Sequence, residues 1–166
     1  SFKARDANIM VLHPQLLKEF NNRWFLLATH KQKHITLALD RMLSIEVDEN
    51  AEYIDLKIDG DKYYKDIVGV TVANTRAERI EFWIDKQNAP YVITKPFLKS
   101  QRLIKHTEDG VIFNILVQPN FELERLILGF GDAIKIQKPE RLKKRIHQKL
   151  SKAIRRYTNS ENKEND

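Results

Sequence analysis

The order of apolar segments between residues 79 and 137 constrains the fold of this chain more than any other feature. Four segments have the patterning of strands and two have that of helices, in the order strand, helix, strand, strand, helix, strand. The strands are predicted at residues 79–85, 98–107, 111–118 and 133–137, and the helices at 87–94 and 119–128. Glu108-Asp109-Gly110 is a hairpin signal between the second and third strands. This order is that of a ferredoxin-like split βαβ module.

The residues after Pro139 predict a final amphipathic helix, because apolar side chains recur there at spacings of three and four. These side chains are Leu142, Ile146, Leu150, Ala153, Ile154 and Tyr157. In the preceding helix, Asn120 is a predicted N-cap and Gly129 a predicted C-terminal cap. Gly129-Phe130-Gly131 follows that helix instead of opening one, which favours a capping turn over a dinucleotide-binding loop.

The first half of the chain contains two strand signals. Residues 23–29 form an apolar and aromatic run after Asn21-Asn22, a pair that tolerates the positive φ of a tight turn. Residues 35–47 alternate apolar and polar side chains, which is the period of a half-buried strand. Arg41 interrupts the apolar row. Either a bulge near Asp40 re-phases the strand, or the guanidinium faces the buried side and needs an anionic partner there.

The net charge of +6 is unevenly distributed. Residues 138–157 hold nine Lys and Arg against Glu140 alone. Earlier in the chain, residues 1–41 carry seven bases and three acids, and residues 42–66 carry three bases and eight acids. An anionic ligand of the main body should therefore bind the early segment. A solvated helix face explains the basic C-terminal segment equally well, and any nucleic acid it bound would be held without sequence preference.

The composition and motifs exclude several classes of function. The chain has no cysteine, which excludes disulfides, thiolate metal sites and thiol nucleophiles. No apolar run approaches the ~18 residues of a membrane span and no signal peptide opens the chain, so we expect a soluble, cytoplasmic protein with no membrane partner. Zinc-protease, nucleophile-elbow and phosphate-loop motifs are missing from the sequence. We therefore expect a protein that is not an enzyme, with no catalytic residues and no cofactor.

Two weak metal signals have simpler explanations. His30 and His34 flank Lys31 and Lys33 in an expected hairpin loop, where an added cation is disfavoured, so a solvated basic turn is the better interpretation. Residues 55–60 partly resemble a calcium loop, but Lys57 stands where a ligand is required, which favours an acidic turn. No metal-binding residues are predicted.

Aromatic and cationic residues of the first half form a candidate ligand site. Trp24 and Phe25 could simply belong to the core, as aromatic residues of strands commonly do. Arg23, His13 and Arg41 nevertheless lie close to them in sequence or on an adjacent predicted strand. An aromatic plane bordered by guanidinium groups can stack a base and pair with a phosphate.

Three short motifs resemble the WYL domain of bacterial transcriptional regulators. They are Leu12-His13-Pro14-x-x-Leu17, Arg23-Trp24-Phe25-Leu26 and Leu39-Asp40-Arg41-Met42. The second half is similar to the C-terminal extension that often follows this domain. The landmarks of the extension are Pro96, Ser100-Gln101, Asp109-Gly110, Glu122-Leu123, Leu128-Gly129-Phe130-Gly131 and Pro139-Glu140-x-Leu142. The likeness rests on the order and spacing of these motifs and covers the chain to about Tyr157.

The resemblance implies two modules. Residues 1–72 would form an Sm-like, SH3-type β-barrel, residues 73–157 the ferredoxin-like extension with its amphipathic helix, and residues 158–166 a disordered tail. In the family, a first barrel strand and a winged helix-turn-helix that binds promoter DNA precede the position of Ser1. We therefore expect the barrel to lack its first strand and to expose an edge. The extension is associated with dimer contacts, which implies a homodimer.

The resemblance also implies that the barrel senses an anionic ligand, with single-stranded nucleic acid or a nucleotide signal as leading candidates. The ligand-binding positions carried over are His13, Arg23, Trp24, Phe25 and Arg41. Phe25 replaces the family's tyrosine and lacks its hydroxyl, and Ala38 stands where many members have arginine. The alternative is a pure dimerisation or protein-interaction module, in which Trp24 and Arg41 are structural and no small ligand binds.

Overall fold

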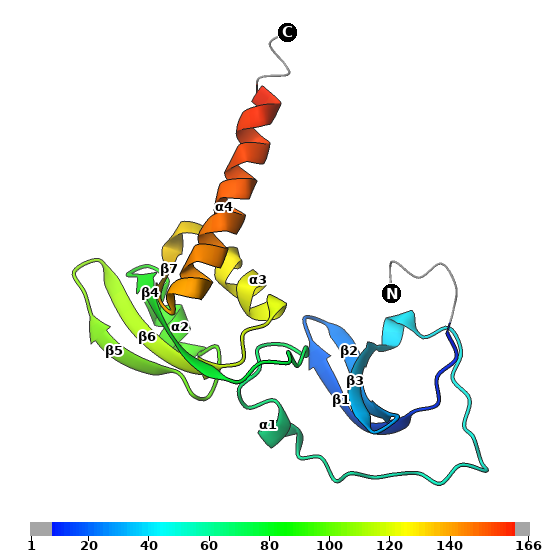
Figure 1. Cartoon of the computed structure of the whole chain (residues 1–166). Coiled ribbons are helices and arrows are strands. Elements are labelled where there is room, and N and C mark those ends of the chain that lie inside the picture. The colour runs from blue at the N-terminus through cyan, green and yellow to red at the C-terminus, as the bar shows by residue number, and fades with distance from the viewer. Residues whose placement is uncertain (1–7, 162–166) are drawn as a thin grey trace. The chain divides into compact units, whose positions relative to one another are not determined.

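The computed structural model describes residues 8–161 and divides into two compact units, each with its own antiparallel sheet. Unit 1 comprises Ser1–Tyr64 and Gly69–Thr71, and unit 2 comprises Lys65–Val68 and Val72–Asp166. Figure 1 shows the elements of both units. Among the described residues, none of the helices combines the length and the apolar character that crossing a membrane requires.

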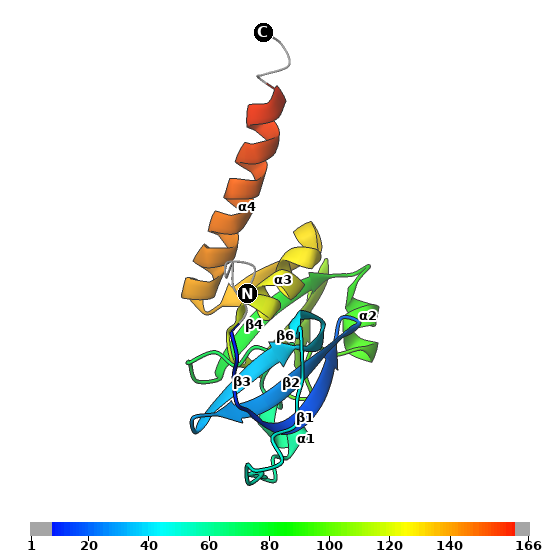
Figure 2. The same cartoon turned by 90° about the vertical axis from the view of Figure 1, so that its right-hand side faces the viewer.

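Unit 1 is built on a three-stranded sheet in the order β1-β2-β3 (Figure 2). Its elements are β1 (His13–Phe20), β2 (Arg23–His30), β3 (Lys33–Ala38), the 3-10 turn η1 (Leu39–Arg41) and α1 (Gly60–Tyr63). Asn21 and Asn22 join β1 to β2 with φ of 51° and 59°, which confirms the predicted tight turn. Lys31 and Gln32 join β2 to β3 with φ of 47° and 64°, so the expected hairpin between His30 and His34 is also present.

The predicted strand over residues 35–47 is wrong beyond Ala38. The chain leaves the sheet in η1, and residues 42–59 have no helix or strand. Leu43, Ile45 and Val47 keep their alternation but are 85%, 75% and 86% exposed. Neither a bulge nor an inward-facing Arg41 explains the interruption of the apolar row, because no described strand pairs with this segment. The described residues of unit 1 consequently form an open sheet and not a closed barrel.

Strand β1 has no clear signal in the sequence. Its pairing with β2 is irregular between Pro14 and Leu16, so the side chains on either side of this point are out of phase. Leu16 and Leu17 are adjacent apolar residues, so the sequence lacks the alternation of apolar and polar residues that marks a strand. The strand is therefore recognisable only from its partner.

Unit 2 has a four-stranded sheet in the order β5-β6-β4-β7, with antiparallel neighbours throughout. Its elements are β4 (Glu78–Asp85), α2 (Ala89–Thr94), β5 (Arg102–His106), β6 (Gly110–Val117), α3 (Phe121–Gly129), the 3-10 turn η2 (Gly131–Ala133), β7 (Ile134–Lys138) and α4 (Glu140–Glu161). The predicted succession of strands and helices is confirmed.

The core of unit 2 lies on one face of this sheet. Alternate residues of β4 and β6 are buried, as expected when one face packs against helices. The helices contribute Val92 from α2, Leu123 from α3 and Leu142 from α4. At the centre, the ring of Phe82 stacks on that of Phe113, with centroids 5.6 Å apart.

Several predicted boundaries change in unit 2. β5 begins at Arg102 and not at residue 98, because the Gln101 N–H donates to the Leu98 carbonyl in a turn. Asn120 is the N-cap of α3, as predicted, and accepts from the Leu123 N–H at 2.8 Å. Gly129, however, is the last residue of α3, and the glycine with left-handed φ (60°) is Gly131.

Helix α4 is longer and less buried than its sequence pattern predicts. Residues 158–161, assigned to a disordered tail, are helical, and residues 162–166 lie outside the described part of the chain. The predicted apolar face is buried at its start but 38%, 62% and 78% exposed at Leu150, Ile154 and Tyr157. Figures 1 and 2 show this second half of α4 projecting from the sheet of unit 2.

Candidate functional site

The sheet of unit 1 separates the residues that the sequence grouped into one ligand site. Successive side chains of a strand point to opposite faces, so Arg23 and Phe25 of β2 lie on one face and Trp24 on the other. Arg23 and Trp24 therefore do not form the predicted arrangement, in which a guanidinium lies beside the indole plane.

Arg23 forms an ion pair with Asp40 on its face of the sheet. Its Nη2 donates to both carboxylate oxygens of Asp40, at 2.8 and 2.7 Å. The guanidinium carbon lies 5.6 Å from the centroid of the Phe25 ring, within range of a cation–π contact. The Arg23 hydrogen bond lowers the pKa of the Asp40 carboxyl, which therefore stays ionised. Because the two side chains are 42% and 59% exposed, solvent reaches this ion pair.

Arg41 lies in η1 beside Asp40 and is exposed. Its positive charge contributes, more weakly than Arg23, to the lowered pKa of Asp40. Two guanidinium groups, one at the start of β2 and one just after β3, thus lower the pKa of the same carboxylate. We call Arg23, Phe25, Asp40 and Arg41 the Arg23 cluster.

Trp24 occupies the opposite face near the same end of the sheet. It pairs with Glu19 of β1 and is 53% exposed. Leu17, which lies on the same face of β1, is 55% exposed. This half of the predicted site is an uncovered apolar surface and not a cationic one.

His13 lies at the far end of β1 from the Arg23 cluster. It pairs with Thr29, six residues along β2 from Arg23, which corresponds to about 20 Å of strand. Its Nδ1 accepts from the Ile54 N–H at 3.3 Å. His13 therefore does not meet Arg23, and its ring contacts the backbone of a different segment.

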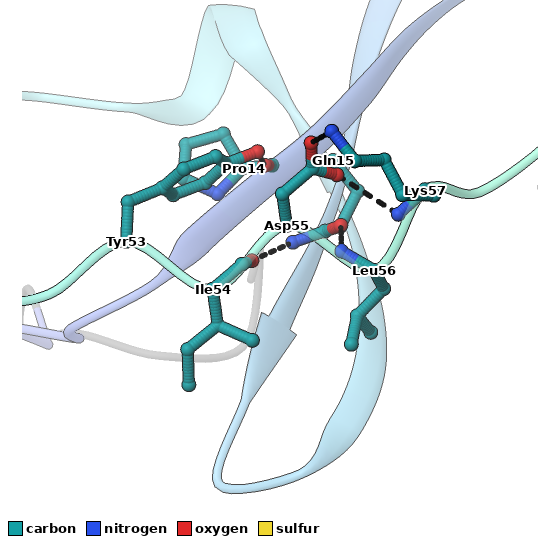
Figure 3. Close-up of polar contacts among 7 residues, drawn as sticks. All are labelled: Pro14, Gln15, Tyr53, Ile54, Asp55, Leu56 and Lys57. Atoms are coloured by element: carbon teal, nitrogen blue, oxygen red, sulfur yellow. Dashed lines mark hydrogen bonds and ion pairs between the residues drawn. The ribbon is translucent and has the colours of Figure 1, made fainter.

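That segment, residues 53–56, is fastened to β1 mainly by side chains, and we call it the strap (Figure 3). The Gln15 amide donates to the Ile54 carbonyl at 2.8 Å and accepts from the Leu56 N–H at 2.9 Å. The Tyr53 hydroxyl donates to the Pro14 carbonyl at 2.6 Å. The Gln15 side chain thus makes hydrogen bonds to the strap backbone of the kind that a neighbouring strand would make. No sequence signal predicts these contacts, because they join residues about forty positions apart.

Lys18 is a further cation of the same unit and is half-buried. The Nζ of Lys18 lies 4.4 Å from the centroid of the Tyr64 ring, and burial lowers the pKa of this amine. Burial also raises the pKa values of Tyr63 and Tyr64. His34 meets the edge of Tyr63 at 5.6 Å between ring centroids. This cluster anchors α1 on the sheet, and no motif in the sequence predicts it.

The acidic turn at residues 55–60 has local roles. Asp59 caps α1 by accepting from the Lys62 N–H at 3.1 Å, and Asp55 forms an ion pair with Lys57 at 2.6 Å. Within the described part of the chain, no group of three or more His, Cys, Asp or Glu side chains is placed to hold a metal ion.

Comparison with known proteins gives one family match. No curated protein matches the sequence. Among solved structures, proteasome accessory factor B/C (PafBC) of Arthrobacter aurescens aligns over 88% of this chain with 16% identity and a TM-score of 0.42. The alignment covers 22% of that chain, so this sequence spans about a fifth of its length. Residues 76–154 match the family model of the WCX domain, a segment that includes β4 to β7 and the first part of α4.

Proposed function

We propose that this chain is the ligand-sensing regulatory portion of a bacterial DNA-binding transcriptional regulator of the WYL type. The WCX match supports this assignment, because that domain is the C-terminal companion of WYL domains. The effector is an anion, either single-stranded nucleic acid or a nucleotide signal, and it binds to unit 1. The protein acts by binding and not by catalysis, in the cytoplasm, as a homodimer whose separate helix-turn-helix domain contacts promoter DNA.

The Arg23 cluster is the observation that carries this proposal. A solvent-accessible guanidinium holds a carboxylate on a face that also presents an aromatic ring. A phosphate also presents two anionic oxygens to a guanidinium, so it can take the place of the Asp40 carboxylate on Arg23. Arg41 then supplies a second cation beside the incoming anion.

The arrangement of unit 2 supports a ferredoxin-like fold for the C-terminal module. The strand order β5-β6-β4-β7 and the antiparallel pairing of all neighbours are what a split βαβ unit produces. Helices α2 and α3 follow the first and third strands of the sheet, and both pack on its buried face.

Isothermal titration of the chain with a mixed single-stranded DNA of about ten nucleotides, and separately with ATP, tests the anion site. Arg23→Gln should weaken binding by about 1.5–3 kcal/mol, the value of a charge-assisted hydrogen bond. Asp40→Asn should strengthen binding, because it removes the internal competitor of the ligand. Trp24→Ala, on the opposite face, is the matched control and should bind like the unmodified chain.

Two outcomes would contradict the anion site. One is that Arg23→Gln and Asp40→Asn both bind with unchanged affinity, and the other is that the unmodified chain binds neither the DNA nor ATP. The alternative is then a dimerisation or protein-interaction module. The exposed pair of Leu17 and Trp24 favours it, because adjacent apolar side chains left in solvent mark interaction surfaces. In that case Trp24→Ala, and not Arg23→Gln, should change the mass measured by sedimentation equilibrium.

A further inference from the structure

The cationic character of α4 is greater than a solvated surface helix requires. Residues 141–160 include eight Lys and Arg and neither Asp nor Glu. Cations three or four positions apart on a helix repel one another and destabilise it. Mixed charges keep a helix soluble without this cost. The unbalanced charge therefore indicates a use beyond solubility.

Part of this charge stabilises unit 2 internally. The carboxylate partners are Glu78 for Arg141, Glu140 for Lys143, and Glu124 for both Arg145 and Lys149. The Glu124 side chain is only 10% exposed and receives its two cations at 2.5 and 2.6 Å. These four cations belong to the first turns of α4, where the helix packs on β7 and α3.

Three further cations have no such role. Lys144, Lys152 and Arg155 are exposed, and no described carboxylate lies within ion-pair distance of them. Lys144 and Arg155 are separated by about 16 Å along the helix axis. One strand of B-DNA presents about five phosphates along that length.

The direction of these side chains distinguishes between ligands. At about 100° per residue, Lys144, Lys152 and Arg155 point to the side of α4 opposite the apolar row that ends at Leu150, Ile154 and Tyr157. A membrane surface or an acidic amphipathic helix needs cations beside an apolar row, so that both are buried together. A phosphate backbone needs the cations alone. The separation of the two faces favours nucleic acid.

We propose that Lys144, Lys152 and Arg155 form a sequence-independent contact site for the phosphate backbone of nucleic acid. This site belongs to unit 2, and it does not depend on the anion site proposed for the Arg23 cluster. It supplies salt-dependent affinity without base recognition, because no side chain among residues 8–158 holds any of the three in a direction that would aim it at a base.

Fluorescence anisotropy with a labelled mixed-sequence DNA duplex of about 20 base pairs, over about 50–200 mM KCl, tests the site. The triple variant Lys144→Gln, Lys152→Gln, Arg155→Gln should lose about tenfold or more in affinity at the lowest salt. It should also flatten the dependence of log K on log salt by about 2–3, since each phosphate contact contributes ~0.9. A matched control removes the same charge elsewhere on unit 2 through Lys86→Gln, Lys105→Gln and Lys135→Gln. The control should stay within about twofold of the unmodified chain.

Circular dichroism should show that the triple Gln variant keeps its helicity. A second triple variant, Lys144→Arg, Lys152→Arg, Arg155→Lys, keeps the charges and should keep the binding, which would show that binding depends on charge at these positions. Equal losses in the triple variant and the control would overturn the proposal, because binding would then follow net charge alone. Loss of duplex binding in Arg23→Gln with the triple variant unaffected would also overturn it. So would binding to vesicles of anionic lipid, but not to DNA, that is lost in Leu150→Gln, Tyr157→Gln.

Discussion

Replacing Gly110 by alanine should damage unit 2 severely, although Asp109-Gly110 has the sequence of an ordinary hairpin turn. Gly110 does not have the positive φ that favours glycine in turns; in this part of unit 2, Gly131 has it. Gly110 is required for a different reason, which is the lack of space for a side chain. A Cβ at Gly110 would lie 2.1 Å from the Ile84 carbonyl oxygen and 2.6 Å from the Trp83 indole nitrogen. The first of these is backbone of the paired strand β4 and cannot rotate away.

The expected cost follows from this geometry. A contact more than about 1 Å inside the normal separation of non-bonded atoms must be relieved by moving β6 away from β4. Overpacking of this kind costs about 1–3 kcal/mol when side chains can adjust, and a backbone obstacle places Gly110→Ala near or above the upper end. For a unit of about 100 residues, ~3 kcal/mol corresponds to a fall in Tm of about 10–20 °C.

Differential scanning calorimetry measures this change, and Gly129→Ala is the matched control. Gly129 is helical, and an added Cβ there meets nothing within 4 Å. Alanine should stabilise that site by about 0.5–1 kcal/mol, because glycine loses more backbone entropy on folding. A Gly110→Ala protein that melts within about 2 °C of the unmodified chain would refute the reasoning from close approach.

Three other outcomes are expected. In an NMR titration, the pKa of the Asp40 carboxyl should lie below the usual range for aspartate, and in Arg23→Gln it should rise towards that range. Because the folded-state pKa is lowered, the ion pair stabilises the fold at pH values above the unfolded-state pKa. This stabilisation is lost as the pH falls through the folded-state pKa. Gln15→Ala should increase hydrogen exchange at the Leu56 amide with little change in that of the β2 amides, and equal protection in both proteins would remove the strap's dependence on this side chain. Trypsin should cleave first after Lys57, because this residue is exposed in a segment without helix or strand, and earlier cleavage within β4 would contradict the division into two units.

The elements of unit 2 were predictable because each carries its own signal. β4 alternates buried and half-buried residues over its length, and Asn120 caps α3 with the local geometry that its position in the sequence implies. In unit 1 the predicted strand is wrong at residues 39–47, although apolar and polar side chains alternate regularly from Leu43 to Val47. An alternating segment becomes a strand only when another strand supplies its hydrogen bonds, and the sequence does not state whether such a partner exists.

The candidate site shows the same division. The sequence identified Arg23, Phe25 and Arg41 as the chemistry of an anion site. Only the tertiary structure decided that Asp40 holds Arg23, that Trp24 faces the other way and that His13 lies at the far end of β1.

Composition and periodicity by themselves determined that this protein has two differently patterned halves, a neutral body and a basic final helix. They did not determine which of the nine cations of residues 138–157 are neutralised, because ion pairs such as that of Glu124 with Lys149 join residues from different elements. Spacing along a helix fixes the direction of a side chain, which is a local property. The partner that the side chain meets depends on how the elements pack, and that is a property of the folded chain alone.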